Sequence, residues 1–220
     1  MSWVSNFLTS SIGRKLVMSL TGLFLIVFLL IHLTGNIMVL IPDEGASFTG
    51  FVEAMEANPL IKVMSIVLML GFAIHILQGI MLYFKNRQSK GAKYAVTPKD
   101  NATWASKNMA LLGTIIFLFL IIHFMDFFIP MKVLKQYGQH ELYHKVILAF
   151  QNPVYVVLYV IGMISLGFHL AHGFQSAFQT LGVNHPKYTP FIKRLGMLYS
   201  VIVPLLFALI PIIVYITHQK

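Results

Sequence analysis

The chain has 220 residues, of which 57% are hydrophobic and only 10% are charged, and its mean hydropathy is +0.77. A soluble domain carries about 25% charged residues, so this composition excludes a soluble protein and predicts an integral membrane protein. The absence of cysteine excludes disulfides, thiolate metal sites, iron–sulfur ligation and covalent haem attachment.

Five apolar segments are each long enough to cross the roughly 30 Å hydrocarbon core of a bilayer as a helix. They lie near residues 16–41, 60–84, 109–130, 153–181 and 195–216. The residues before the first segment do not resemble a cleavable signal, so we expect the first helix to remain as a span. The sequence therefore predicts an all-α protein in which residues 1–220 form a single five-helix membrane domain.

The basic residues are distributed unevenly between the two sides of this arrangement. With the N-terminus inside, the inner segments hold 11 of the 16 lysines and arginines, and the outer segments hold six of the seven acids. The positive-inside rule then predicts a cytoplasmic N-terminus and an external C-terminus. The net charge of +9 needs no nucleic acid to explain it. The basic loop 85–107 is interpreted either as a contact with anionic lipid or as a docking surface for a cytoplasmic partner.

A tandem repeat is indicated by four of the predicted helices. The first and third read LTGLFLIVFLLIH and LLGTIIFLFLIIH, each with a glycine ten residues before its histidine. The second and fourth open NPLIKVM and NPVYVVL, and each reaches a histidine sixteen residues after its proline. We expect two copies of one hairpin, related by a pseudo-twofold axis along the membrane normal. The fifth helix has no counterpart.

The histidines of this repeat fall at two depths. His32 and His123 lie about 25 and 24 Å along their helices from the inner boundary, near the outer face. His75 lies about 15 Å from the inner boundary, and His169 shares its register. We call His32 and His123 the first pair, predicted to be outer, and His75 and His169 the second pair, predicted to be inner.

Two facing imidazoles are the arrangement that holds one haem iron from both sides, since the apolar porphyrin needs only axial protein ligands. The sequence therefore predicts two b-type haems stacked across the bilayer. Glycines near the histidines either let a flat macrocycle approach the backbone or only permit tight helix packing; they are Gly22, Gly35, Gly71, Gly79, Gly113, Gly167 and Gly173.

Other functions remain open for intramembrane histidines, which are rare and usually functional. A transporter or proton pathway is the main alternative, although it would more often place carboxylates at mid-membrane. A mononuclear metal site would gather its ligands at one depth rather than two. A membrane scaffold without redox chemistry is the third class.

Two stretches carry a family resemblance, SIGRKLVMSLTGLFLIVFLLIHLTGN and GFHLAHGFQSAFQTLG. They resemble the dihaem cytochrome b anchor of succinate dehydrogenases and fumarate reductases, of the single-anchor type in Bacteroidetes and related to the Bacillus protein. The resemblance covers all five helices and implies that each histidine pair holds one haem b. It disfavours His172 as a ligand. The repeat aligns His172 with Gln78, one turn nearer the cytoplasm than the second pair, which makes it a candidate propionate contact, and Arg194 is a second candidate by its depth at the inner start of the fifth helix.

Quinone contacts are also implied by the resemblance. Ser11 and Arg14, in SSIGRK, look like the serine and arginine that bind quinone in some anchor subunits at the cytoplasmic end. Glu53 and Glu56 lie in the segment comparable to one whose carboxylate serves the outer quinone in a fumarate reductase relative. Asp126, one turn past His123, is a further candidate at the outer end.

The same resemblance implies the partners. A flavoprotein subunit carrying covalent FAD and an iron–sulfur subunit would lie on the cytoplasmic side of a bacterial inner membrane. Succinate or fumarate chemistry would belong to the flavoprotein subunit. This chain would be the cytochrome b subunit that passes electrons between the iron–sulfur subunit and a quinone, menaquinone in particular.

Overall fold

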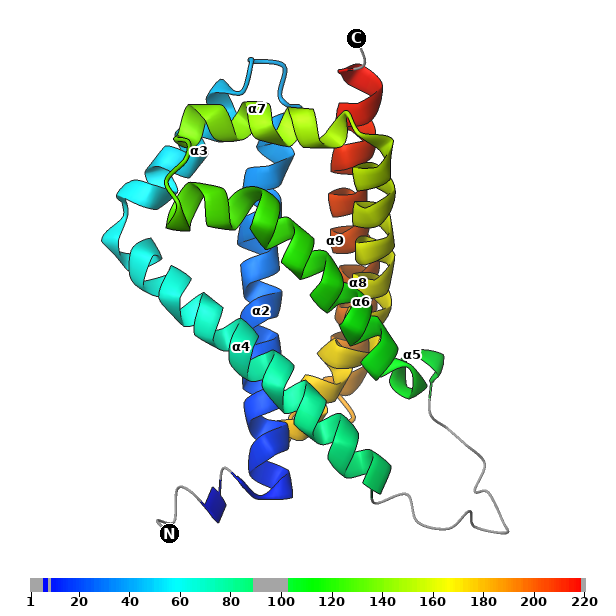
Figure 1. Cartoon of the computed structure of the whole chain (residues 1–220). Helices are drawn as coiled ribbons and strands as arrows, with labels where there is room; N and C mark the ends of the chain where they lie inside the picture. Colours follow the sequence, from blue (N-terminus) through cyan, green and yellow to red (C-terminus); the bar gives the residue numbers. More distant parts are fainter. Residues whose placement is uncertain (1–5, 8, 89–102, 219–220) are drawn as a thin grey trace.

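Five membrane-spanning helices dominate the computed structural model, which describes residues 6–7, 9–88 and 103–218. The described residues form helices and contain no strand, which confirms the all-α class and the five predicted spans. The spans are α2 (Ser11–Ile37) continued by η1 (Met38–Leu40), α4 (Pro59–Gln88), α6 (Met109–His123) continued by η2 (Phe124–Val133), α8 (Pro153–Thr180) and α9 (Thr189–Thr217). The chain is thus a multi-pass membrane protein, in which α2 begins and α9 ends at opposite ends of the bundle (Figure 1).

The two Asn-Pro pairs begin their helices in the same way. The side chain of Asn58 accepts a hydrogen bond from the Leu60 N–H at 2.9 Å, and that of Asn152 accepts one from the Val154 N–H at 2.9 Å. Proline follows at the first helical position, where the N–H it lacks would have had no partner within the helix. The repeated motif is therefore a helix-start signal in both α4 and α8.

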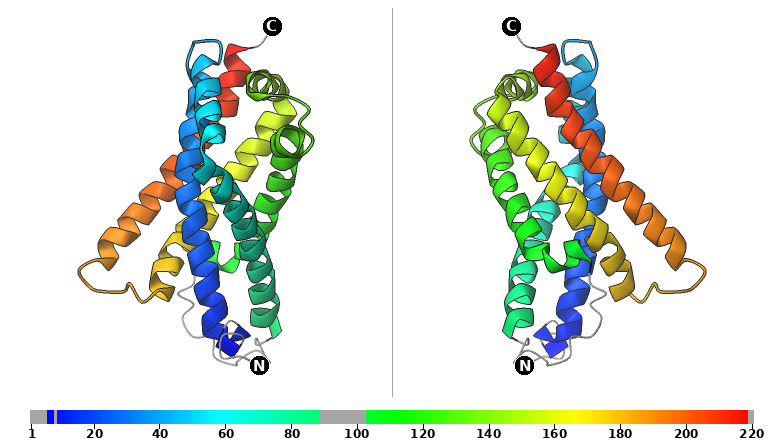
Figure 2. Two further views of the ribbon diagram at one scale, coloured as in Figure 1. Left: turned by 90° about the vertical axis from the view of Figure 1, so that its left-hand side faces the viewer. Right: turned by 90° about the vertical axis from the view of Figure 1, so that its right-hand side faces the viewer.

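Two shorter helices lie across one end of the bundle, α3 (Ala46–Ala57) and α7 (Gln139–Phe150) (Figures 1 and 2). The buried face of α7 packs with Phe48 of α3 and with Val214 of α9 in one apolar cluster. We call this end, to which α3 and α7 belong, the capped end. These two helices were not predicted from the sequence, because a helix of twelve residues with a polar face is too short to span a membrane.

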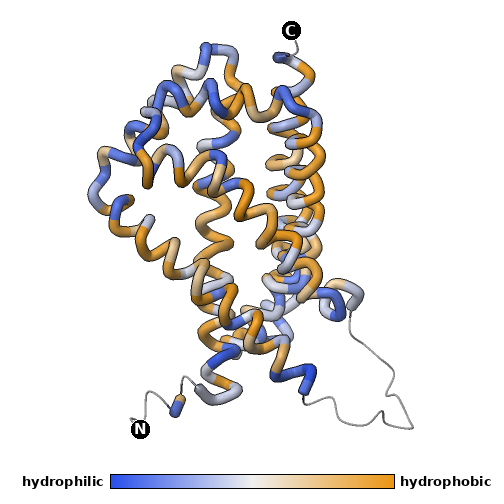
Figure 3. Tube along the Cα trace, viewed as in Figure 1, coloured by the Kyte–Doolittle hydropathy of each residue, from blue (hydrophilic) through white to orange (hydrophobic). Residues whose placement is uncertain are grey.

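The opposite end is basic. Figure 3 shows apolar stretches along the spans and hydrophilic segments at both ends of the bundle. We call this opposite end the basic end. Eight of the described cations lie there, in helix starts and ends or in the turn between α8 and α9: Arg14, Lys15, Lys85, Arg87, Lys107, Lys187, Lys193 and Arg194. The six described acids belong to the capped-end segments or, for Asp126, to the span that leads into them. Much of the predicted basic loop, residues 89–102, lies outside the described residues.

The spans pack unequally. Helices α8 and α9 approach closely at Gly167, where an added Cβ would lie 3.1 Å from the Ser200 carbonyl oxygen. The Tyr199 hydroxyl of α9 donates to the Ile26 carbonyl of α2 at 2.6 Å. By contrast, α4 has a single buried residue, Gly71. Helices α2, α8 and α9 therefore form the packed part of the bundle, with α4 beside it.

The third span differs from the expected regular helix. Its α-helical part ends at His123, and a π-helix follows from Phe124 to Val133. Pro130 explains the change, because it has no N–H to donate to the Asp126 carbonyl four residues earlier. The Tyr137 hydroxyl donates to that carbonyl instead, at 3.0 Å. Helical segments of this rare kind often lie at functional sites.

The start of α3 is expected to depend on pH through Asp43. Its carboxylate accepts hydrogen bonds from the Ser47 hydroxyl and from the N–H groups of Gly45 and Ser47. These bonds lower its pKa below 3.8, and the bond from the Ser47 hydroxyl has the largest effect. A lowered carboxyl pKa contributes stability that is present above the unfolded value and lost as the pH falls through the folded value. The thermal midpoint of Asp43→Ala should lie below that of the wild type at pH 7, and the difference should shrink towards pH 3. A difference that stays constant over this range would contradict the role of the carboxylate, and Glu44→Gln is the control.

Candidate functional site

The four intramembrane histidines meet as two pairs. The ring centres of His32 on α2 and His123 on α6 lie 5.7 Å apart, with an angle of 84° between the planes. Those of His75 on α4 and His169 on α8 lie 6.2 Å apart, at 64°. All four side chains are half-buried. The structure therefore brings together the same partners as the two pairs inferred from sequence depth.

The two pairs lie at clearly different levels, as two helices independently indicate. On α2, Thr21 contacts His75, and His32 follows eleven residues later, a rise of about 16 Å. On α8, Tyr159 contacts His123, and His169 follows ten residues later, a rise of about 15 Å. The first pair lies towards the capped end and the second towards the basic end.

The spacing within each pair fits axial ligation of a haem. Imidazole nitrogens bind metals at about 2 Å, so a linear nitrogen–iron–nitrogen arrangement holds the ring centres about 6 Å apart. The observed 5.7 and 6.2 Å match this value. The Nδ1 atom of His169 is buried and has no hydrogen-bond partner among the described residues. These residues also contain no group of three or more histidines and carboxylates that could hold a metal ion, so the pairs are the candidate sites.

The glycines divide between the two roles considered for them. A Cβ at Gly35 would meet the Phe51 ring, and one at Gly167 would meet α9, so these two glycines serve helix packing. A Cβ at Gly113 or Gly173 would meet nothing within 4 Å. Among the seven glycines near the histidines, only these last two stand at open space, as expected of glycines that leave room for a flat ligand.

The candidate propionate contacts lie nearer the basic end. His172 is half-buried on α8, one turn beyond His169, and Gln78 of α4 has a buried side-chain oxygen without a partner in the described part of the chain. Arg194 is exposed near the start of α9. His172 and Gln78 therefore place polar groups one turn beyond the second pair on two helices.

The quinone candidates of the basic end lie beside α4. Ser11, at the start of α2, is exposed and accepts a hydrogen bond from Lys85 Nζ at 2.8 Å. Arg14 is half-buried one turn further along α2. The lysine ties α2 to the end of α4, so the Ser11 hydroxyl already serves a contact between helices.

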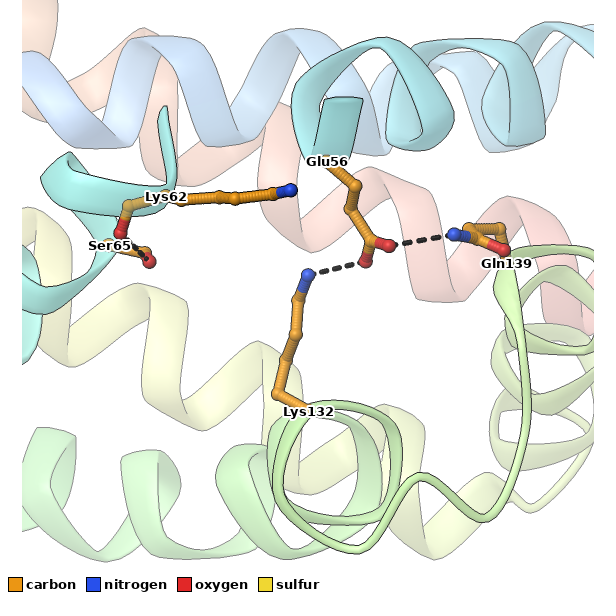
Figure 4. Close-up of polar contacts among 5 residues, drawn as sticks. All are labelled: Glu56, Lys62, Ser65, Lys132 and Gln139. Carbon is orange, nitrogen blue, oxygen red and sulfur yellow. Dashed lines mark hydrogen bonds and ion pairs between the residues drawn. The ribbon is translucent and has the colours of Figure 1, made fainter. Parts of the chain in front are cut away.

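The candidate glutamates of the capped end form polar links. Glu56 pairs with Lys132 of η2 and accepts a hydrogen bond from Gln139 of α7 at 2.7 Å, and Lys62 also points towards it (Figure 4). Glu56, Lys132 and Gln139 line part of a pocket of about 560 Å³. Glu53, by contrast, is exposed and lies 3.5 Å from the His140 ring. Glu56 therefore connects the end of α3 with η2 and α7.

Asp126 lies in a group of hydroxyls that sequence reasoning missed. Its Oδ1 atom lies 3.4 Å from the Tyr155 hydroxyl of α8, and its Oδ2 atom is buried without a partner in the described part of the chain. Burial, and then the Asp126 charge, raise the pKa of Tyr137. Tyrosines on α8 and beyond η2 carry no periodic signal that would have linked them to Asp126.

No protein-family model, curated protein sequence or solved structure matches this chain. The fold and the side chains define its class: a multi-pass membrane protein with five spans and two facing histidine pairs.

Proposed function

We propose that this protein is the dihaem cytochrome b anchor of a succinate:quinone oxidoreductase, carrying electrons between an iron–sulfur subunit and a quinone. The observation that supports the proposal is the meeting of four histidines, from four spans, as two pairs with ligand-like spacing at two levels. A haem held by two imidazoles supplies one-electron transfer and has no open coordination position for oxygen. The catalytic flavoprotein and iron–sulfur subunits would bind at the basic end, on the cytoplasmic side.

The residues of this chain have distinct tasks in the proposal. The histidine pairs hold and orient the cofactors, and the apolar walls of the spans exclude water from them. In this proposal the half-buried His172 and the exposed Arg194 would contact the propionates of the haem held by the second pair. The spans keep these groups at fixed depths in the bilayer.

A reduced-minus-oxidised absorption spectrum of the purified protein tests the proposal. We expect a b-type α-band and two haems per polypeptide, extractable without cleaving a covalent bond because the chain has no cysteine. A protein without this band would favour the alternatives, a proton or ion pathway through the histidines or a scaffold without redox chemistry. Proton flux through liposomes containing the haem-free protein would then separate these two.

We propose that quinone reacts at the capped end, where Asp126 exchanges its protons. The support is the Oδ2 atom of Asp126, one turn beyond His123, which is buried and has no hydrogen-bond partner among the described residues, whereas Ser11 already accepts a hydrogen bond from Lys85. Asp126→Asn should lower succinate-driven quinone reduction by the assembled complex roughly 10²-fold, as expected for loss of an acid–base group. Both haems should stay bound. Ser11→Ala is the control, and a loss in Ser11→Ala with none in Asp126→Asn would move the site to the basic end.

A further inference from the structure

One imidazole in each histidine pair has a hydroxyl partner from a neighbouring helix. The Thr21 hydroxyl oxygen of α2 lies 3.2 Å from Nδ1 of His75. The Tyr159 hydroxyl oxygen of α8 lies 3.3 Å from Nδ1 of His123. The other members are held differently: His32 stacks on Phe28 with ring centres 5.1 Å apart, and His169 Nδ1 has no hydrogen-bond partner within the described residues.

The Thr21 contact favours the tautomer of His75 that carries hydrogen on Nδ1. The hydroxyl donates to the Val17 carbonyl at 2.8 Å, one turn back along α2. Its oxygen is therefore left to accept from the imidazole, which places the hydrogen on Nδ1 and leaves the Nε2 lone pair free. The α2 backbone runs close beside the ring, since a Cβ at Gly22 would lie 3.4 Å from its Cε1 atom. Helix α2 thus sets both the position and the tautomer of His75.

Tyr159 is equally well placed beside His123. Only 7% of this residue is exposed. Its ring packs edge-on against Phe119 and Phe150, each with ring centres 4.9 Å from its own. These contacts hold the phenol oxygen beside His123 Nδ1. The oxygen accepts a hydrogen bond from Nδ1 when that nitrogen carries hydrogen.

The two hydroxyls serve the histidines of the two most loosely packed spans. Helices α4 and α6 each have one buried residue, whereas α2 has five and α8 has eight. A histidine on a well-packed helix is oriented by its backbone and its neighbours. His75 and His123, on the loosely packed helices, gain their orientation from a side chain on a well-packed one.

We propose that Thr21 and Tyr159 are positioning residues, each holding one axial histidine of a pair with hydrogen on Nδ1 so that Nε2 can bind iron. This inference rests on the proposed haem function. A hydrogen bond from Nδ1 makes the ligating nitrogen a stronger donor, and partners of this kind typically change metal affinity by about 10–100-fold. Because stronger donation favours the oxidised metal, losing either hydroxyl should raise the reduction potential of one haem only.

Redox titration of the purified cytochrome, followed by its absorption spectrum, tests the proposal. Thr21→Val should raise the potential of the haem that is missing in His75→Ala. Tyr159→Phe should raise that of the haem missing in His123→Ala. In each case the ratio of the site's affinities for oxidised and reduced haem should change roughly tenfold. Thr21→Ser, which restores the hydroxyl, should return the wild-type potential. Loss of the one haem in Thr21→Val, with its recovery in Thr21→Ser, supports the proposal equally.

Matched controls remove hydroxyls that do not contact the histidine rings. Thr34→Val, also on α2, removes a hydroxyl that donates to the Leu30 carbonyl, and Tyr199→Phe removes a phenol that donates to the Ile26 carbonyl. Both should keep wild-type potentials. Unchanged potentials in Thr21→Val and Tyr159→Phe, with both haems bound, would overturn the inference and leave the proposed function standing. A wild-type protein without haem would overturn the proposed function itself.

Discussion

Replacing His123 with alanine is expected to remove one of the two proposed b haems while the other stays bound. Alanine leaves His32 without the ring that lies 5.7 Å from it, so the first pair has one axial ligand instead of two. The second pair lies about 15 Å away along α8 and shares no residue with the first. Haem content should fall from two to one per polypeptide, measured by absorption spectra and haem extraction on protein of known concentration.

The other histidines provide the controls for this result. His75→Ala should remove the other haem, and the spectra of the two single variants should add up to that of the wild type. His172→Ala and His144→Ala should keep both haems, because neither ring belongs to a pair. Retention of both haems in His123→Ala, or loss of one in His172→Ala, would show that the pairs have been assigned wrongly.

The spans were predictable because a run of about twenty apolar residues rarely forms anything but a membrane-spanning helix. The meeting of the histidine partners also followed from sequence positions. His75 and His169 have equal offsets from their Asn-Pro starts, and His32 and His123 lie at similar distances past Lys15 and Lys107. The vertical spacing was less accurate. Distances counted along the sequence from the basic boundary put the two pairs about 10 Å apart. In the structure, the rises from Thr21 to His32 on α2 and from Tyr159 to His169 on α8 put them about 15 Å apart. Helix α4 runs obliquely (Figure 1), so its length of about 15 Å from Lys85 to His75 covers less depth.

The surroundings of the histidines were not predictable in the same way. Thr21, Tyr155 and Tyr159 act through contacts between helices, and such contacts depend on helix rotation, which apolar segments without a polar face do not specify. The π-helix after His123 also has no local signature beyond Pro130. Proline signals a break in hydrogen bonding, but whether the chain bends, ends or widens there depends on partners such as Tyr137.

The cap over the first pair is expected to loosen when Gly45 is replaced by alanine. Gly45 begins α3 with a φ of 87°, a left-handed conformation that costs other residues about 1–2 kcal/mol. An added Cβ would also overlap the Tyr143 ring of α7, which is buried in the cluster at the capped end. Overpacking of this kind costs about 1–3 kcal/mol. Together these two costs predict that the free energy of unfolding falls by roughly 2–5 kcal/mol, which is measurable as a lower thermal midpoint in detergent.

Gly50→Ala provides the matched control, because Gly50 lies in the same short helix and a Cβ there meets nothing within 4 Å. Alanine in a helix interior is favoured over glycine by about 0.5–1 kcal/mol, so this variant should be as stable as the wild type or more so. The cluster that contains Tyr143 also contains Tyr159, which contacts His123. On heating, Gly45→Ala should therefore lose the haem proposed for the first pair before the one proposed for the second. Simultaneous loss of both haems would mean that the cap stabilises the whole bundle rather than the first pair. A thermal midpoint of Gly45→Ala equal to that of the wild type would show that α3 and α7 do not depend on this contact.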